Sequence, residues 1–193
     1  MRKYLVAALL AAGVATPAFA QSGASFTGPR VEAIVGWDHS GRNDTGHNNG
    51  VAYGVGAGYD FQMGGAVVGV EGEASDATTD RCAHDVSVPG DALCFKAKRD
   101  LYVGGRIGGV VGSNTLLYAK AGYTNGRFGL DYNDGGTGAA NFKSGRNLDG
   151  YRVGAGVEHA IGTKSFVKAE YRYSNYQDGF DRHQVVAGVG FRF

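Results

Sequence analysis

The last ten residues of the chain, 184–193, alternate strictly between two kinds of side chain. One face is small or polar, and the other is wholly apolar and consists of Val185, Ala187, Val189, Phe191 and Phe193. A period of two is the repeat of a β-strand, whose successive side chains point to opposite faces. A terminal strand of this kind is typical of a transmembrane β-barrel.

Seven further segments alternate in the same way, and most approach the roughly 9–11 residues that a tilted strand needs to cross a bilayer. With the terminal strand, the predicted strands are residues 30–38, 51–61, 66–75, 99–111, 116–125, 149–161, 166–176 and 184–193. The pattern therefore predicts an all-β fold, an eight-stranded antiparallel up-and-down transmembrane β-barrel. We expect its last strand to pair with its first, so that no edge is left open in lipid.

Short and long connections alternate along the chain. The tight turns are predicted at 63–64, 112–114 and 162–163, and the longer polar connections at 40–50, 76–98, 126–148 and 177–180. In barrels of this class the short turns face the periplasm and the longer loops face outward. We therefore expect four extracellular loops and two periplasmic termini.

Aromatic residues gather near the ends of the predicted strands, on the apolar face. The predicted outer girdle is Trp37, Tyr53, Tyr123, Tyr151 and Tyr173, and the inner one is Tyr59, Phe61, Phe191 and Phe193. Such girdles lie at the depth of the lipid headgroups. The alternative, that Tyr and Phe are simply common in strands, does not explain why they gather at strand ends.

The opposite face is small or charged, which a soluble sandwich could not bury without pairing every charge. An eight-stranded barrel has an interior that side chains just fill, and interleaved glycines leave volume for long ones. We expect structural ion pairs there, Glu71 with Arg106 and Glu158 with Lys168, or alternatively a charged pore lining. The predicted lumen charges are Glu71, Arg106, Arg152, Glu158, Lys168, Glu170, Arg172 and Arg192.

The N-terminal segment has the pattern of a secretory signal peptide. Arg2 and Lys3 precede an apolar run at 5–14, and Ala18-Phe19-Ala20 is a small-x-small cleavage site. The run is short for the alternative, a membrane helix. We expect cleavage between Ala20 and Gln21, which divides the chain into a signal peptide (1–20), a short lead (21–28) and the barrel (29–193).

Charge and composition exclude several classes of protein. Without Arg2 and Lys3, 17 basic residues face 18 acidic ones, which argues against nucleic acid as a partner. Glycine makes up 34 of 193 residues but has no period of three, so the chain is not collagen-like.

Cys82 and Cys94 are the only cysteines, and both lie in the second long connection. In an exported chain this predicts a disulfide, which would stabilise by about 3 kcal/mol in the chain-entropy model. The alternative is a metal site, but two cysteines with only His84 nearby do not complete tetrahedral ligation.

Other motifs do not carry a site. The glycine-rich runs lie within strands, without the helix that a dinucleotide loop requires. Residues 131–136 begin like a calcium loop but lack its later ligands. Asp38, His39, Asp44 and His47 could meet a metal, although a solvated loop explains them better. We expect no metal and no cofactor.

Ser174 lies in a short motif that resembles a catalytic one. Tyr173-Ser174-Asn175 is similar to the His-x-Ser-Asn pattern of lipid A deacylase barrels, but Arg172 stands where that family has its catalytic histidine. His183 is the nearest alternative base in the sequence. A serine without a placed base is not activated, so we do not expect an enzyme.

Two stretches resemble a known family: Asp100 with 106–108, 113–119 and 122–123, and 154–158 with 168–173 and 189–193. They resemble the small outer-membrane barrels of alphaproteobacteria, often called porin-family or opacity-like, with a barrel similar to the OmpA-type transmembrane domain. The resemblance implies insertion by the barrel-assembly machinery, which reads a C-terminal aromatic strand such as Phe191 and Phe193. Family members often have Trp where this chain has Leu101 or Tyr151, and the cysteine-containing loop is not a general feature of the family. The peptidoglycan-anchoring role of full-length OmpA-type proteins is not expected.

These observations favour a non-enzymatic structural and surface-interaction protein of the outer membrane. Its expected surroundings are outer-membrane lipid and lipopolysaccharide, and we expect a monomer. The alternatives are a narrow channel for small solutes or ions and a soluble periplasmic barrel of lipocalin type, which would need polar outward positions.

Overall fold

The computed structural model describes residues 25–42, 46–78, 80–84, 92–133 and 142–193. The predicted signal peptide and its cleavage site lie outside these residues. The strands are β1 (Gly28–Arg42), β2 (Gly46–Met63), β3 (Ala66–Ala77), β4 (Asp80–His84), β5 (Ala92–Val111), β6 (Thr115–Asn133), β7 (Phe142–Ile161), β8 (Ser165–Tyr176) and β9 (Phe180–Arg192), with a 3₁₀ turn, η1 (Gln177–Gly179), between β8 and β9. No helix among the described residues has the length and apolar character needed to cross a bilayer.

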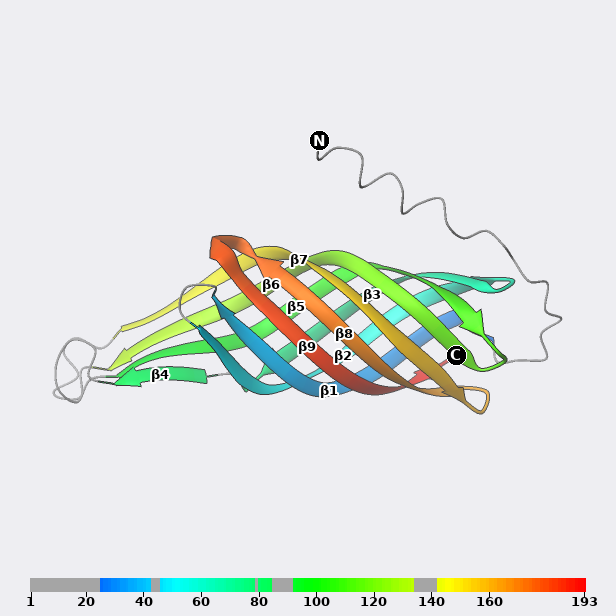
Figure 1. Cartoon of the computed structure of the whole chain (residues 1–193), viewed down its shortest axis with the longest axis horizontal. Coiled ribbons are helices and arrows are strands. Elements are labelled where there is room, and N and C mark those ends of the chain that lie inside the picture. The colour runs from blue at the N-terminus through cyan, green and yellow to red at the C-terminus, as the bar shows by residue number, and fades with distance from the viewer. Residues whose placement is uncertain (1–24, 43–45, 79, 85–91, 134–141) are drawn as a thin grey trace, which may run out of the picture.

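Eight of these strands form a closed antiparallel barrel (Figure 1). Neighbours in the chain pair with one another, β3 pairs with β5, and β9 returns to β1. The ladder between β1 and β9 runs from Arg30 opposite Arg192 to Arg42 opposite Phe180. The predicted fold class and the pairing of the last strand with the first are therefore confirmed.

The barrel is apolar outside and polar inside, as the alternation predicts. Outward Val189 and Phe191 are 58% and 56% exposed, whereas inward Arg182 and Gln184 on the same strand are each 1% exposed. In water such a surface would be unfavourable, because it exposes a continuous apolar band. The same surface matches a bilayer and argues against the soluble lipocalin-type alternative.

The three tight turns lie at one end of the barrel. Gly64, Gly112 and Gly162 adopt φ of 61°, 69° and 73°, a conformation that glycine reaches without the steric cost of a Cβ. All three fall in the predicted short connections.

At the other end the strands are longer than predicted. The prediction of a loop at 126–148 was wrong for much of its length. Strands β6 and β7 stay paired from Gly126 opposite Leu148 to Tyr132 opposite Phe142. Strands β4 to β7 reach well beyond the rest of the barrel at this end (Figure 1). The β6 positions that continue the outward apolar row of the barrel are polar or glycine from Asn125 to Asn133, so the apolar row that marks the strand in the sequence ends while the backbone ladder continues.

The expected loop at 76–98 also contains paired strands. β4 pairs with the start of β5, from Asp80 opposite Lys96 to His84 opposite Ala92. Strand β5 thus changes partner, from β3 inside the barrel to β4 beyond it. A β-bulge between Ala97 and Asp100 marks the change.

The predicted girdle residues lie on the outward face. Trp37, Tyr53, Tyr59, Phe61, Tyr123 and Tyr151 are all exposed. Tyr173 is half-buried, and its ring lies 4.9 Å from the His183 ring of the neighbouring strand. Their depth in a membrane stays a prediction.

Candidate functional site: the charged interior of the barrel

The interior holds a balanced set of charges. Among the described residues, sixteen charged side chains are buried, and eight are basic and eight acidic. They are Arg30, Arg106, Lys120, Arg152, Lys168, Arg172, Arg182 and Arg192, with Glu32, Asp38, Asp60, Glu71, Glu73, Asp100, Glu158 and Glu170. The structure places all eight predicted lumen charges in this set.

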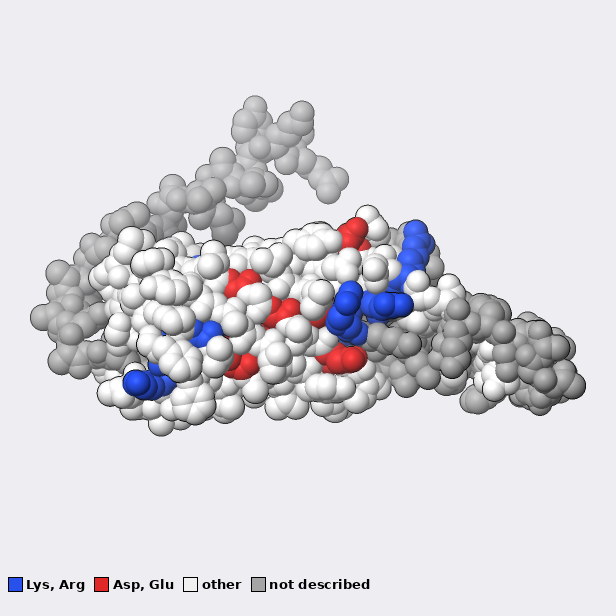
Figure 2. Space-filling view, turned by 180° about the vertical axis from the view of Figure 1, so that it is seen from behind, with Lys and Arg blue, Asp and Glu red and all other residues white. Residues whose placement is uncertain are grey.

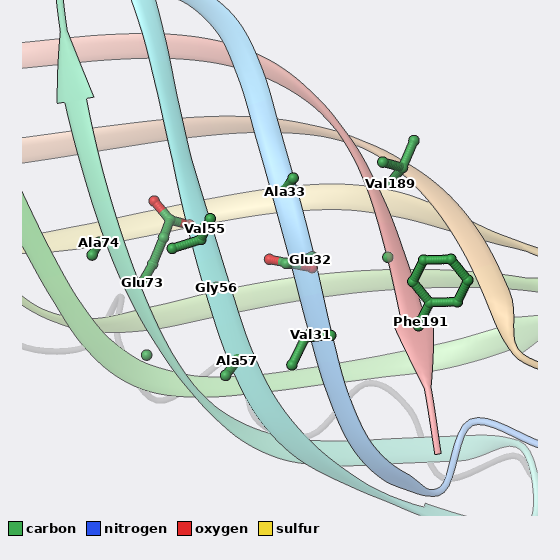
Figure 3. A pocket seen from close by; sticks show the side chains of 12 residues that line it. Val31, Glu32, Ala33, Val55, Gly56, Ala57, Glu73, Ala74, Val189 and Phe191 are labelled. Carbon is green, nitrogen blue, oxygen red and sulfur yellow. The ribbon is translucent and has the colours of Figure 1, made fainter.

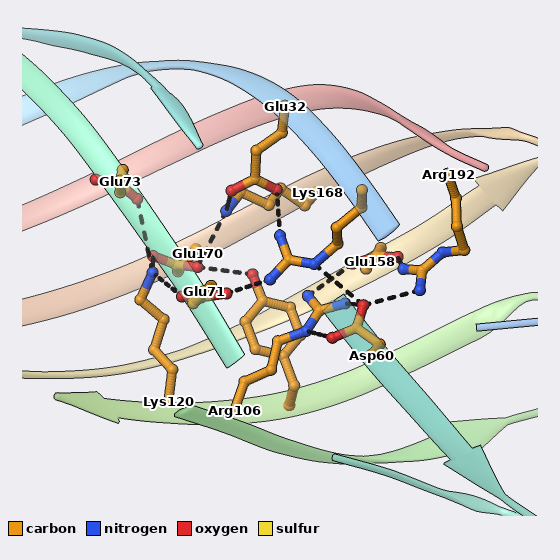
Figure 4. Close-up of polar contacts among 12 residues, drawn as sticks. Glu32, Asp60, Glu71, Glu73, Arg106, Lys120, Glu158, Lys168, Glu170 and Arg192 are labelled. Atoms are coloured by element: carbon orange, nitrogen blue, oxygen red, sulfur yellow. Dashed lines mark hydrogen bonds and ion pairs between the residues drawn. The ribbon is translucent and has the colours of Figure 1, made fainter. Parts of the chain in front are cut away.

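Three arginines meet one carboxylate near the tight turns (Figure 4). Asp60 Oδ2 lies 2.6 Å from Arg106 Nη2, 2.8 Å from Arg192 Nη1 and 3.1 Å from Arg30 Nε. Glu158 completes the group, with one oxygen 2.9 Å from Arg106 Nη1 and the other 2.6 Å from Arg192 Nη2. Because guanidinium groups have several donors in fixed positions, they can share carboxylates in this way.

Two lysines hold the middle of the barrel. Lys120 Nζ lies 2.7 Å from Glu71 Oε1 and 3.0 Å from Glu170 Oε1. Lys168 Nζ lies 2.7 Å from Glu32 Oε1 and 3.3 Å from Glu170 Oε2. Each ammonium thus bridges carboxylates from different strands (Figure 4), which ties opposite walls of the barrel together.

Asp100 is the centre of a third group, toward the extended end. It pairs with Arg152, its Oδ2 lies 3.1 Å from Arg182 Nη1, and Tyr176 donates a hydrogen bond to the same oxygen at 2.8 Å. Thr124 donates to Oδ1 at 2.6 Å. A buried carboxylate that accepts several hydrogen bonds regains much of the solvation that burial removes.

Phe26, in the predicted lead, closes the turn end of the interior. Its side chain is 1% exposed and packs in a cluster with Val67, Leu116 and Tyr118. Its amide donates to Gln62 Oε1 at 2.8 Å, and its carbonyl accepts from Arg192. Phe26 is therefore part of the barrel interior at this end.

The predicted ion pairs have other partners. Glu71 pairs with Arg30 and Lys120 instead of Arg106. Lys168 lies opposite Glu158 in the ladder, but it binds Glu32 and Glu170, while Glu158 binds Arg106 and Arg192. These two pairings were wrong because long side chains reach across the interior as easily as to the next strand.

Sequence reasoning also missed the aromatic residues inside. Tyr102, Tyr118 and Tyr176 are buried, and Tyr118 donates to Glu170 Oε2 at 2.7 Å. The Lys120 ammonium lies 4.7 Å from the centre of the Tyr102 ring, a cation–π contact. Their places on the polar face of their strands were a usable signal.

The two residues considered for catalysis, Ser174 and His183, lie on opposite faces of the barrel wall. Ser174 is buried and accepts a hydrogen bond from Arg152 Nε at 2.8 Å. His183 lies on the outward face, where its Nδ1 is 2.7 Å from the Tyr171 hydroxyl. Among the described residues, no group of three or more His, Cys, Asp or Glu side chains could hold a metal. The region of Asp44 and much of the calcium-like segment lie outside the described residues.

The two cysteines face each other across a ladder. Cys82 lies directly opposite Cys94 where β4 pairs with β5, beyond the barrel. Directly opposite residues of antiparallel strands have Cα atoms within the range that a disulfide spans. This register supports the predicted bond.

A shallow apolar hollow lies on the outer wall of the barrel, over β9, β1, β2 and β3 (Figure 3). Small side chains such as Ala33, Ala57 and Ala74 form it between larger ones such as Val55 and Phe191. Because these outward residues would face hydrocarbon in a bilayer, the hollow indicates no separate site for a polar ligand.

Comparison with known proteins agrees with this geometry. A family described as outer membrane protein beta-barrel domain matches residues 6–193. A 22 kDa outer membrane protein of Rhizobium leguminosarum bv. viciae is 29% identical over 163 residues, which cover 76% of this chain and 68% of that protein.

Solved structures show the same fold. The attachment invasion locus protein Ail of Yersinia pestis is 15% identical with a TM-score of 0.60, over 86% of this chain and 99% of that one. Neisserial surface protein A is 17% identical, also with a TM-score of 0.60, over 86% and 98%. The chain therefore belongs to the outer membrane protein beta-barrel domain family, a family of small non-enzymatic barrels in the outer membrane of Gram-negative bacteria.

Proposed function

We propose that this protein is a structural and surface-interaction barrel whose extended end, with β4 and the ends of β5, β6 and β7, faces the outside of the cell. Both termini are then periplasmic. The barrel-assembly machinery inserts the chain by reading Phe191 and Phe193, and the protein stands as a monomer among outer-membrane lipid and lipopolysaccharide.

The filled interior carries this proposal. Its eight basic and eight acidic side chains are joined by ion pairs, and Phe26 packs into the turn end. Such an interior provides rigidity but little room for a ligand or a transported solute, because an eight-stranded barrel is just wide enough for side chains. Interaction is therefore left to the surface, and the strands that project beyond the barrel supply most of it.

The channel is the weaker alternative. Moving an ion through the interior would require separating several buried ion pairs, which leaves charges without partners in a site shielded from water. We expect the refolded protein to be silent in planar bilayers. Reproducible conductance steps that Gly156→Val abolishes would favour the channel, because a Cβ at Gly156 would lie 2.7 Å from the interior Tyr118 hydroxyl.

Orientation is the direct test of the proposal. Ser144 is exposed on the extended end and Lys164 in a tight turn at the other end. We expect a membrane-impermeant maleimide to label Ser144→Cys on intact cells and to label Lys164→Cys only after the outer membrane is opened. The reverse pattern would contradict the proposed orientation.

A further inference from the structure

Exposed basic residues are gathered at one end of the barrel. Of the twelve Lys and Arg residues whose side chains the structure describes, eight are buried and four are exposed. Lys164 lies alone in a tight turn, whereas Arg99, Arg127 and Arg146 lie on β5, β6 and β7 toward the extended end. Figure 2 shows blue side chains gathered toward this end of the barrel.

The β-bulge places two of these arginines side by side. Ala97 lies opposite Phe128 and Asp100 opposite Gly126, so two residues of β5, one of them Arg99, face the single residue Arg127 of β6. Among the nine described strand pairings, only this one contains a register shift. Bulges re-aim side chains at the rims of barrels, and this one lies where β5 leaves the barrel.

Two acidic residues lie near this end, and both accept hydrogen bonds from neutral donors. Asp149 accepts hydrogen bonds from the Tyr123 hydroxyl and, at 2.7 Å, from Asn125 Nδ2. Asp76 accepts from the Ala77 amide at 2.7 Å. In the part of the chain that the structure describes, no ion pair joins Arg99 or Arg127 to an acidic side chain.

With the extended end outside, we expect the two arginines at the depth of the lipid headgroups. Arg127 follows outward Tyr123 by four residues on β6, which is about 13 Å along the strand and roughly 10 Å of height at the usual tilt. Arg99 is closer, two residues from outward Leu101. The polar layer of a bilayer adds about 5–8 Å beyond the hydrocarbon on each side, and arginine side chains can reach toward it.

We propose that Arg99 and Arg127 form a binding site for a phosphate group of an outer-leaflet lipid, the lipid A part of lipopolysaccharide. The site rests on the proposed orientation, which puts the extended end outside. Guanidinium groups bind phosphate oxygens through two parallel hydrogen bonds, and paired arginines facing the lipid on the wall of the barrel present these donors at the right height.

The test titrates the refolded protein in detergent micelles with lipid A and with the same lipid after removal of its phosphates. Binding is measured by native mass spectrometry for the wild type, Arg99→Gln/Arg127→Gln and the matched control Lys164→Gln. We expect the double variant to lose roughly 10- to 30-fold in affinity for lipid A. The control should keep the wild-type affinity, and dephosphorylated lipid should bind wild type and double variant equally weakly.

The variant Arg99→Lys/Arg127→Lys is the control for misfolding. It keeps the positive charge, so it should lose less affinity for lipid A than the glutamine variant. Unchanged lipid A binding by the glutamine variant would overturn the proposal, and so would an equal loss in the Lys164 control. A sulfated oligosaccharide is titrated in the same way. If the glutamine variant loses binding to this oligosaccharide but keeps its binding to lipid A, the site belongs to a soluble polyanion and the proposal is also overturned. Micelle binding does not depend on orientation, so failure of the maleimide test with binding intact would refute only the assignment to the outer leaflet.

Discussion

At the scale of single residues, each of several buried carboxylates is shared by more than one basic side chain. Asp60 is bound by three arginines from three other strands, and Glu170 by two lysines and Tyr118. Removing one cation from such a group leaves the acid with partners, whereas removing the acid leaves several cations facing one another. We therefore expect substitution of a buried acidic residue to lower the stability of the barrel more than substitution of one of its basic partners.

We predict that Asp60→Asn destabilises the barrel by about 3–5 kcal/mol, because three guanidinium groups lose their shared carboxylate in a buried site. The measurement is the free energy of unfolding in urea from lipid vesicles. Asp149→Asn is the matched control, since that acid is exposed at the rim, and it should leave the free energy of unfolding nearly unchanged. Equal effects would mean that burial of the shared acid is not the cause.

Neighbouring glycines give a second residue-scale test. A Cβ at inward Gly104 would lie 2.5 Å from the Ala121 carbonyl oxygen, whereas at outward Gly105 the nearest atom would be 3.5 Å away. Gly104→Ala should therefore lower the free energy of unfolding by about 1–3 kcal/mol through overpacking, measured as a lower urea midpoint, and Gly105→Ala should not. The opposite order would contradict the assignment of faces on β5.

At the scale of elements, hydrophobic alternation predicts strands only where a bilayer requires one apolar face. Residues 184–193 could be assigned to a strand because every outward position is apolar. Residues 126–133 and 142–148 pair just as regularly, but the row of positions that is outward and apolar within the barrel becomes polar or glycine here, so the pattern resembles a polar loop. The bulge before Asp100 was not predictable, since it depends on where β5 changes partner.

The proposed disulfide belongs to this extension and not to the barrel. We expect the purified protein to gain 2 Da on reduction, the mass of two hydrogens. Cys94→Ser should make β4 more sensitive to protease while the heat-shifted gel mobility of the barrel persists. A free thiol in the non-reduced protein would refute the bond, and loss of the gel shift would place its role in the barrel.

At the scale of the whole molecule, strand order and closure follow from the chain, because alternating short and long connections allow one meander. The contacts between side chains across the interior cannot be predicted from the sequence in this way. Arg192 reaches Asp60 on β2 and Glu158 on β7, and Arg152 of β7 reaches Glu73 of β3 at 3.4 Å. Such pairings depend on the tilt and stagger of the strands, which sequence spacing does not contain.

Closure gives the last residue a measurable role. The Phe193 amide donates to the Pro29 carbonyl at 2.9 Å, which joins the two ends of the barrel wall. Deleting Phe193 should lower the amount of protein in the outer membrane far more than deleting residues 134–141, as quantified by immunoblot of outer-membrane fractions. Comparable amounts of the two variants would show that the terminal ring is not an assembly signal.

The balance of charge inside the barrel is not uniform along the chain. Of the buried charges that the structure describes, β1 to β3 contribute one basic and five acidic, whereas β5 to β9 contribute seven basic and three acidic. The buried charges of the first part therefore sum to −4 and those of the second part to +4. The two sets come together when β3 pairs with β5 and β9 pairs with β1. Two copies of the same part repel each other, and unlike parts attract. This distribution of charge therefore favours a chain that closes on itself over pairing between like parts of different chains.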